Sequence, residues 1–153
     1  MSVAEVRAFF AEKAPDIVVI ELEEVTATVD LAAQGHGVEP AQIAKTLSLK
    51  AGGRNFLVVM RGDARLDNKK AKVAFGGKVS MLAPEEVEAV TGHPVGGVCP
   101  FGLRTPLPVY CDVSLQAFDE VVPAAGSIRS AVRINPIRMA GLVGATWFDV
   151  AQV

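Results

Sequence analysis

The sequence is poor in the residues on which disulfide-rich and metal-binding proteins depend. Among 153 residues it has two cysteines, Cys99 and Cys111, and two histidines, His36 and His93. Two cysteines in a chain without an export signal are more typical of free thiols than of a disulfide framework. The four residues also match no metal-ligand spacing. We therefore expect no disulfide, no metal and no cofactor.

Long apolar runs and charge are scarce as well. No apolar stretch continues for the roughly 18 residues of a membrane span, and the first residues do not show the basic and then apolar pattern of a signal peptide. Charged residues make up 21% of the chain and the formal net charge is −2, so the whole molecule does not attract DNA electrostatically. We expect a cytoplasmic protein without DNA or membrane partners.

Hydrophobic residues make up 50% of the chain, and there are no repeats, linkers or low-complexity segments. The patterns predict helices at 3–14, 67–75, 84–92 and from 135 onward, a further helix from 28 that ends at Gly35 or Gly37, and a helical turn at Pro40. They predict strands at 17–22, 45–50, 55–60, 79–82, 107–113, 131–134 and 145–148, and surface turns at 115–118 and 124–127. This mixture indicates a single α+β domain over residues 1–153, with a mixed, mostly antiparallel sheet surrounded by helices.

Residues 91–102 stand out because they contain four glycines and two prolines. Such a segment is neither a helix nor an ordinary strand. Its backbone presents consecutive N–H groups along a curve, which suits a carbonyl oxygen or a phosphate. The alternative is a tight connection between a helix and a strand.

Lys45 opens a predicted strand, where alternation places it on the same face as Leu47 and Leu49. A lysine on an apolar face is costly unless an anionic group meets it. Lys45 is therefore a candidate for binding a substrate phosphate or carbonyl. Alternatively, its stem packs on the sheet while the ammonium group reaches water.

The order and spacing of several motifs resemble the YbaK family, the free-standing relatives of the editing domain inserted in bacterial prolyl-tRNA synthetases. The motifs are Ile43-Ala44-Lys45-Thr46-Leu47, Gly62-Asp63-x-Arg65-Leu66-Asp67-x-Lys69-Lys70, Thr91-Gly92 and the Gly-x-x-x-Pro loop from Gly96 to Pro100. The resemblance covers nearly the whole chain and implies a YbaK-like fold.

The resemblance also implies an aminoacyl-tRNA deacylase, which hydrolyses the ester of a mischarged tRNA in trans. The expected substrate is a small amino acid, such as alanine or cysteine, on proline tRNA, and prolyl-tRNA synthetase is a further expected partner. A synthetase pocket discriminates against a missing methylene by only about 1–3 kcal/mol, so a second sieve is needed. The attacking group is expected to be water or a hydroxyl of the terminal ribose.

In this interpretation Lys45 is required for activity and lies beside the aminoacyl-adenosine end of the tRNA. The family loop holds the ester carbonyl through backbone N–H groups, and its members here are Gly96, Gly97, Val98, Cys99 and Pro100. A small substrate pocket is expected from the small residues of one turn and from nearby polar residues: Thr28, Thr46, His93, Ala124, Ala125 and Gly126. His36, in a Gly-His-Gly sequence, is expected to mark a helix end.

Six basic residues fall between positions 61 and 78. On their own they indicate a solvated helix face. With the resemblance, the preferred interpretation is a contact surface for the tRNA acceptor stem, formed by Arg65, Lys69, Lys70 and Lys72.

Other functions remain open at this stage. A non-catalytic module that binds tRNA or a synthetase would share the fold and the basic helix. A thiol hydrolase would use Cys99 with His93 as its base, but no third group that could orient His93 is evident. Some relatives carry an acidic residue where this chain has Ala131-Val132-Arg133, which weakens any assignment of a carboxylate base.

Overall fold

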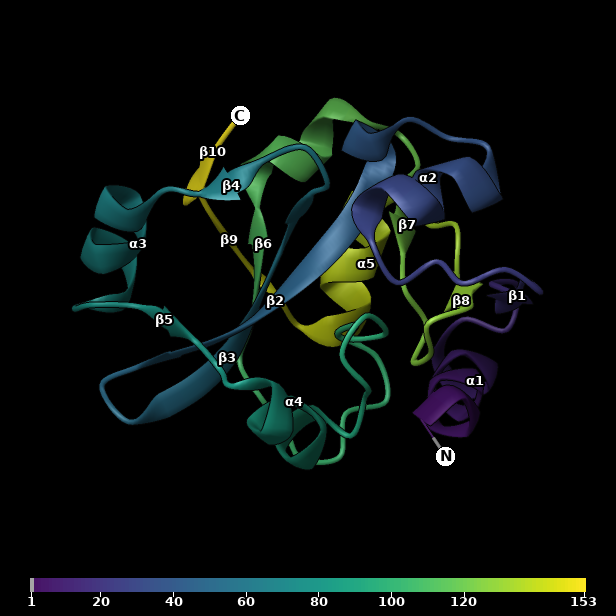
Figure 1. Cartoon of the computed structure of the whole chain (residues 1–153), viewed down its shortest axis with the longest axis horizontal. Coiled ribbons are helices and arrows are strands. Elements are labelled where there is room, and N and C mark those ends of the chain that lie inside the picture. Colours follow the sequence, from purple (N-terminus) through teal and green to yellow (C-terminus); the bar gives the residue numbers. More distant parts are fainter. Residues whose placement is uncertain (1) are drawn as a thin grey trace.

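A mixed, six-stranded sheet forms the centre of the computed structural model, which describes residues 2–153 (Figure 1). Its strands lie in the order β5 (Ser80–Met81), β2 (Ile43–Ala51), β3 (Arg54–Arg61), β6 (Val109–Asp112) and β9 (Thr146–Phe148), and β7 (Val122–Pro123) also pairs with β2. Two small sheets join β1 (Ile20–Glu21) to β8 (Ser130–Ala131) and β4 (Arg65–Leu66) to β10 (Ala151–Gln152).

Strand β2 is antiparallel to β3 and β5, while the pairs β3–β6, β6–β9 and β2–β7 are parallel. Both small sheets are antiparallel. The predicted α+β class, with a mixed and mostly antiparallel sheet surrounded by helices, is confirmed.

The helices begin and end close to the positions that the sequence predicts. They are α1 (Ser2–Lys13), α2 (Val29–His36), α3 (Asn68–Phe75), α4 (Pro84–Thr91) and α5 (Pro136–Val143), with 3₁₀ turns at Pro40–Gln42 and Val113–Ala117. The Thr28 hydroxyl accepts the Leu31 N–H at 3.2 Å, and Asp67 accepts the N–H groups of Lys69 and Lys70. These caps supply acceptors for N–H groups that have no partner within a helix.

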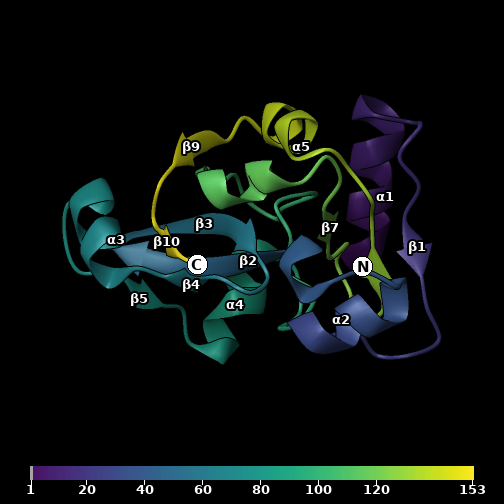
Figure 2. The ribbon, with the colours of Figure 1, turned by 90° about the horizontal axis from the view of Figure 1, so that it is seen from above.

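Each face of the central sheet is covered by a different hydrophobic cluster. Leu57, Val59 and Cys111 pack with α1 and α5 on one face. On the other face, Leu49, Val58 and Met60 pack against α3 and the β4–β10 pair. Figure 2 shows α3 at the opposite end of the molecule from α1 and α2. The alternating side chains of β2 and β3 therefore contribute to two separate cores.

One edge of β2 is only partly paired. Strand β7 pairs with Ile43 and Ala44, and β5 pairs with Leu49 and Lys50. Among the described residues, no strand pairs with positions 45–47 on that edge. The sheet is therefore open on this side at the position of Lys45, and unpaired backbone groups of an edge strand can bind an extended ligand.

Several sequence-based predictions were wrong in extent. The strand predicted at 17–22 is reduced to Ile20–Glu21, which pairs with Ser130–Ala131. The strand predicted at 131–134 is interrupted, because beyond Ala131 it is reduced to an isolated bridge between Ile134 and Val121. The short strands β4 and β10 were not predicted. The surface turn expected at 115–118 lies within a 3₁₀ helix region in which Leu115 is completely buried.

The buried carboxylate of Asp112 ties the last strand to the sheet. It accepts the N–H groups of Val150 at 2.7 Å, Ala151 at 3.0 Å and Ser114 at 2.9 Å. Three backbone donors compensate for the removal of this carboxylate from water. Within the described residues, the helices fall short of the length and hydropathy that a transmembrane span needs.

Candidate functional site

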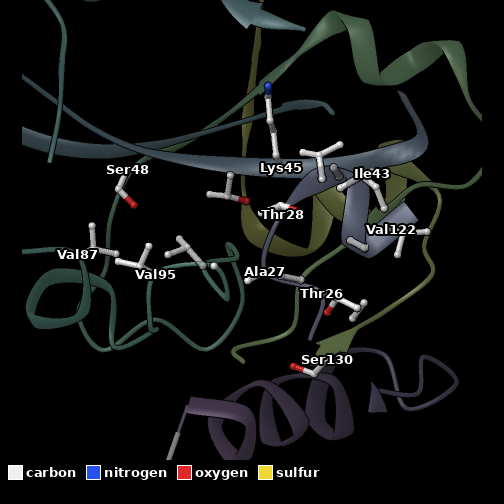
Figure 3. A pocket seen from close by; sticks show the side chains of 18 of the residues that line it. Thr26, Ala27, Thr28, Ile43, Lys45, Ser48, Val87, Val95, Val122 and Ser130 are labelled. Atoms are coloured by element: carbon white, nitrogen blue, oxygen red, sulfur yellow. The ribbon is translucent and has the colours of Figure 1, made fainter. Parts of the chain in front are cut away.

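A cavity of ≈ 200 Å³ lies at the open edge of β2. Its walls come from residues 26–29 and α2, from β2, from α4 and the loop after it, and from the region of β7 and β8. Figure 3 shows Ser48, Thr28, Val87 and Val95 on the same side of the β2 ribbon. Of the predicted site residues, the cavity is lined by Thr28, Lys45, Thr46, Gly96, Val98 and Ala124.

Lys45 lies at the cavity, but its ammonium group points away from it. Figure 3 shows the side chain on the side of β2 opposite to Ser48 and Thr28. The ammonium donates a hydrogen bond to the Ala64 carbonyl. Burial lowers the pKa of Lys45, and the nearby Asp63 carboxylate offsets part of this effect. The ammonium group is therefore bonded to a backbone carbonyl of the same chain, with the Asp63 carboxylate nearby.

The glycines at 96 and 97 allow the loop to approach the segments behind it. A Cβ on Gly97 would lie 2.7–2.8 Å from backbone atoms of Ser127, and one on Gly96 would lie 2.9 Å from the Ala27 Cβ. Gly96 also has a φ of +88°, which side-chain-bearing residues rarely adopt. These glycines therefore serve close packing between backbone segments.

The backbone donors of the loop differ in how they are used. The Gly97 N–H donates to the Pro94 carbonyl at 2.9 Å. Among residues 2–153, the N–H groups of Gly96 and Val98 have no acceptor, and both residues line the cavity. Two unpaired donors beside a cavity can stabilise a developing negative charge on a carbonyl oxygen.

His93 and Cys99 are buried beneath the loop rather than exposed to the cavity. His93 Nε2 donates to the Phe101 carbonyl at 2.7 Å, and its Nδ1 accepts from the Ser2 hydroxyl. Burial raises the pKa of the Cys99 thiol to about 12. A side chain without solvent access and with so little thiolate is unsuited to nucleophilic attack. These observations argue against the thiol hydrolase.

The comparisons with known proteins agree with this geometry. The family model "Aminoacyl-tRNA editing domain" matches residues 23–140, a segment that includes all the cavity-lining residues. The chain belongs to the aminoacyl-tRNA editing domain family. The resemblance to YbaK-type editing proteins is thereby confirmed.

Individual relatives of this editing domain extend the match to nearly the whole chain. YwhH of Bacillus subtilis, an uncharacterized protein, is 44% identical over 99% of this chain and 98% of its own length. EbsC of Enterococcus faecalis, named for a proposed Cys-tRNA(Pro)/Cys-tRNA(Cys) deacylase activity, is 29% identical over 77% of this chain and 73% of its own. A crystal structure described as a candidate trans-editing enzyme for prolyl-tRNA synthetase has a TM-score of 0.92 at 35% identity, covering 99% and 98% of the two chains.

Sequence reasoning missed several polar residues of the editing domain's cavity. The missed side chains are Thr26, His36, Ser48 and Ser130. His36 does end α2, with Gly37 as its cap, but its ring also lines the cavity. The expected pocket residues His93, Ala125 and Gly126 lie outside the lining, as do Gly97, Cys99 and Pro100. The missed residues come from four separate segments, so no local motif could have indicated them.

The basic residues lie away from the cavity of the editing domain. Lys69, Lys70 and Lys72 belong to α3, and Arg65 belongs to β4 beside it. Lys70 forms an ion pair with Asp149 at 3.0 Å and also contacts the Ala151 carbonyl. Lys69 and Lys72 are exposed. Among the described residues, no three His, Cys, Asp or Glu side chains are grouped so that they could hold a metal ion.

Proposed function

We propose that this chain is an aminoacyl-tRNA deacylase that hydrolyses, in trans, the ester of a small amino acid wrongly attached to tRNA, with proline tRNA as the favoured substrate. The observation that carries the proposal is the cavity at the open edge of β2, where the N–H groups of Gly96 and Val98 have no acceptor among the described residues. Family membership and the names of EbsC and the trans-editing structure support the same reaction class.

The small volume of the cavity fits this substrate class. A cavity of ≈ 200 Å³ is smaller than the roughly 300–1,000 Å³ of drug-sized pockets. It can admit an aminoacyl group with a short side chain. Larger, correctly attached side chains would be excluded by its walls, which include Val29, Val95 and Val122. A synthetase excludes side chains larger than its own substrate but admits smaller ones, and a small editing cavity accepts only those smaller ones.

The reaction follows from the groups at the cavity. A water molecule attacks the ester carbonyl, and the Gly96 and Val98 N–H groups stabilise the oxyanion. If the free ribose hydroxyl attacks first, the aminoacyl group moves to that oxygen and water must then hydrolyse the new ester. The C–O bond to the ribose then breaks and the ribose oxygen takes a proton; the water route leaves a free amino acid and uncharged tRNA. The cavity lining within the described residues includes no Asp or Glu. The protein therefore acts mainly by positioning the ester and by stabilising the negative charge that develops on its carbonyl oxygen.

Lys45 is proposed to bind the phosphate of the terminal nucleotide. An anionic phosphate at the open edge of β2 would compete with the Ala64 carbonyl for the ammonium group. The side chain is half-buried and a lysine has four rotatable side-chain bonds, so we expect the exchange to proceed by rotation about these bonds.

The test is a deacylation panel with several amino acids on proline tRNA, using the wild type, Lys45→Met and Lys50→Met. Lys50 lies on the same strand but pairs with the exposed Glu86 at 3.4 Å, so it serves as the matched control. We expect Lys45→Met to lose at least about 100-fold in kcat/KM and Lys50→Met to retain activity. Full activity in folded Lys45→Met would refute the assigned role, and a wild type inactive on every ester would refute the function.

A second candidate is a non-catalytic module that binds aminoacyl-tRNA or a synthetase. It is favoured by the orientation of the Lys45 ammonium group away from the cavity. This candidate predicts tRNA binding without ester hydrolysis. The same panel, combined with a tRNA-binding measurement, distinguishes the two.

A further inference from the structure

We propose that His93 is a positioning residue for the hydrolysis. Its imidazole closes the base of the loop at residues 94–100 and thereby holds the Gly96 and Val98 N–H groups where the ester carbonyl binds. The proposal rests on the deacylase function above. It gives a role in catalysis to a side chain that does not line the cavity, and to helix α1, which lies outside the matched segment 23–140.

The imidazole joins the two ends of this loop. His93 directly precedes the loop and Phe101 directly follows it, and His93 Nε2 donates to the Phe101 carbonyl at 2.7 Å. The first and last residues of the loop are Pro94 and Pro100. Proline has no N–H group, so neither of these residues can close the base through its own backbone donor. A side-chain donor takes that place.

The backbone of His93 is itself fixed to α4. Its N–H donates to the Thr91 hydroxyl at 3.0 Å, and this hydroxyl donates to the Val87 carbonyl at 2.7 Å. The Arg104 N–H donates to the Thr91 carbonyl at 3.1 Å, just outside the bond between His93 and Phe101. Thr91 and His93 are both completely buried. The imidazole therefore reaches the far end of the loop from a fixed starting point.

Helix α1 fixes the tautomer of the ring. A carbonyl oxygen only accepts, so Nε2 carries a hydrogen, and Nδ1 of the neutral ring is then an acceptor. Nδ1 accepts from the Ser2 hydroxyl at the start of α1. Burial lowers the pKa of His93, and the Phe101 carbonyl and the Glu5 carboxylate offset part of this effect. Near pH 7 the ring is therefore neutral, and both of its nitrogens have partners.

Few other bonds hold the loop. Among the described residues, its backbone takes part in two backbone–backbone hydrogen bonds, from the Gly97 N–H to the Pro94 carbonyl at 2.9 Å and from the Gly126 N–H to the Gly97 carbonyl at 3.1 Å. The directions of the Gly96 and Val98 N–H groups therefore depend on how the two ends of the loop are held. A displacement of about 1 Å at a catalytic group can cost roughly 100-fold in rate.

The test removes the two ring nitrogens separately. Glutamine places an amide nitrogen near the position of Nε2, whereas asparagine places a polar atom near Nδ1 and is too short to reach the Phe101 carbonyl. With a small aminoacyl ester on proline tRNA, His93→Asn should lower kcat by about 10- to 100-fold. KM should change little, because the loop donors act mainly in the transition state. His93→Gln should retain most of the wild-type kcat.

Ile134→Val is the matched control for a loss of stability. Ile134 is 2% exposed and belongs to the same hydrophobic cluster as Phe101, but it lies outside the loop and the cavity lining. The substitution should lower the free energy of unfolding and leave kcat unchanged. If kcat falls equally in His93→Asn and His93→Gln, or follows stability in all three variants, His93 serves only the fold and the proposal is overturned.

Hydrogen exchange of the Gly97 N–H gives a second readout that does not depend on turnover. It should be at least about 10-fold faster in His93→Asn than in the wild type or His93→Gln. Unchanged exchange would overturn the inference even if deacylation is confirmed. If the wild type hydrolyses no ester, the proposed function fails, and faster exchange would still support closure of the loop by His93.

Ser2→Ala is the second variant, for use if His93→Asn does not fold. It removes one of the two hydrogen bonds of the ring and leaves the bond to Phe101. We expect a smaller loss of kcat than in His93→Asn, together with faster Gly97 exchange. If both quantities stay at their wild-type values, the proposal is overturned.

Discussion

Burial strongly changes the acidity of the Cys99 thiol. Its thiol has no solvent access, and desolvation raises its pKa to about 12; the pKa of Cys111 is likewise raised to about 12. Because alkylation requires an accessible thiolate, we expect iodoacetamide to label neither cysteine in the native protein and both in urea. Mass spectrometry of the labelled protein measures this directly.

Cys99→Ala tests the same point through catalysis. The variant should retain most of the deacylase activity, because the proposed roles in the loop belong to backbone N–H groups. It should lose about 1 kcal/mol of stability through the small cavity that it creates. Rapid native labelling of Cys99, or an inactive Cys99→Ala protein of wild-type stability, would restore the thiol hydrolase.

At the scale of elements, the loop after α4 is fixed by its contact with the turn at Ser127. In Gly97→Val, the Cβ would lie 2.7–2.8 Å from the Ser127 backbone, so loop and turn must separate. We expect a loss of about 2 kcal/mol or more and a large loss of activity, because the Gly96 and Val98 N–H groups would move with the loop.

Gly141→Ala is the matched control for that prediction. Gly141 lies within α5, and a Cβ there meets no atom within 4 Å. Alanine should raise stability by about 0.5–1 kcal/mol, because glycine is a poor helix former. Urea unfolding of both variants measures the contrast, and similar losses in the two would contradict the packing argument.

Helix α3 carries the residues proposed to contact tRNA. Lys70 is a poor choice for a test because it also holds Asp149 and the Ala151 carbonyl. Neutralising Lys69 and Lys72 should weaken tRNA binding, and the log–log salt slope should fall by about 0.7–0.9 for each phosphate that is no longer neutralised. The maximal rate should change less than the affinity, because α3 lies at the opposite end of the molecule from α2 (Figure 2).

The control carries the same change in charge at a different place. Arg7 and Lys13 lie on α1, at the other end of the molecule from α3. Their joint replacement by glutamine should leave the salt slope unchanged. If the two double variants behave alike, the tRNA does not dock on α3.

Predictions that rest on local sequence patterns were more accurate than predictions that depend on contacts between residues far apart in the chain. The starts of the helices at residues 28 and 67 depend on local signals and were predicted correctly, as were the adjoining strands β2 and β3. Strands β4 and β10 depend on pairing between residues far apart in the chain. The same holds for the cavity, whose lining residues come from segments that only the tertiary fold brings together.

At the scale of the whole molecule, both histidines lie in its interior. His36 is 8% exposed and His93 is fully buried, and burial lowers the pKa of each. The unfolded chain binds protons at these sites below a pKa of about 6.5, whereas the folded chain binds them only at lower pH. The free energy of unfolding should therefore decrease as the pH drops below about 6.5 and continue to decrease until the pH reaches the folded-state pKa values. Above about pH 7.5 it should not depend on these two groups.

Urea unfolding between pH 7.5 and pH 5 measures this dependence. Its slope should approach about 1.4 kcal/mol per pH unit for each histidine. His36→Leu should remove one of the two contributions. A stability that stays constant from pH 7.5 to pH 5 would show that both histidines titrate normally in the folded protein.

The carboxylate of Asp112 also bears on how the protein is synthesised. As the chain leaves the ribosome, β6 emerges well before Val150 and Ala151, which supply two of its three N–H donors. Until then, burying this carboxylate would be costly, so β6 cannot settle into the sheet. A nascent chain stopped at residue 148 should be digested rapidly by protease, and one that exposes residue 152 should resist. We therefore expect the order of synthesis to delay the burial of Asp112 until β10 is available.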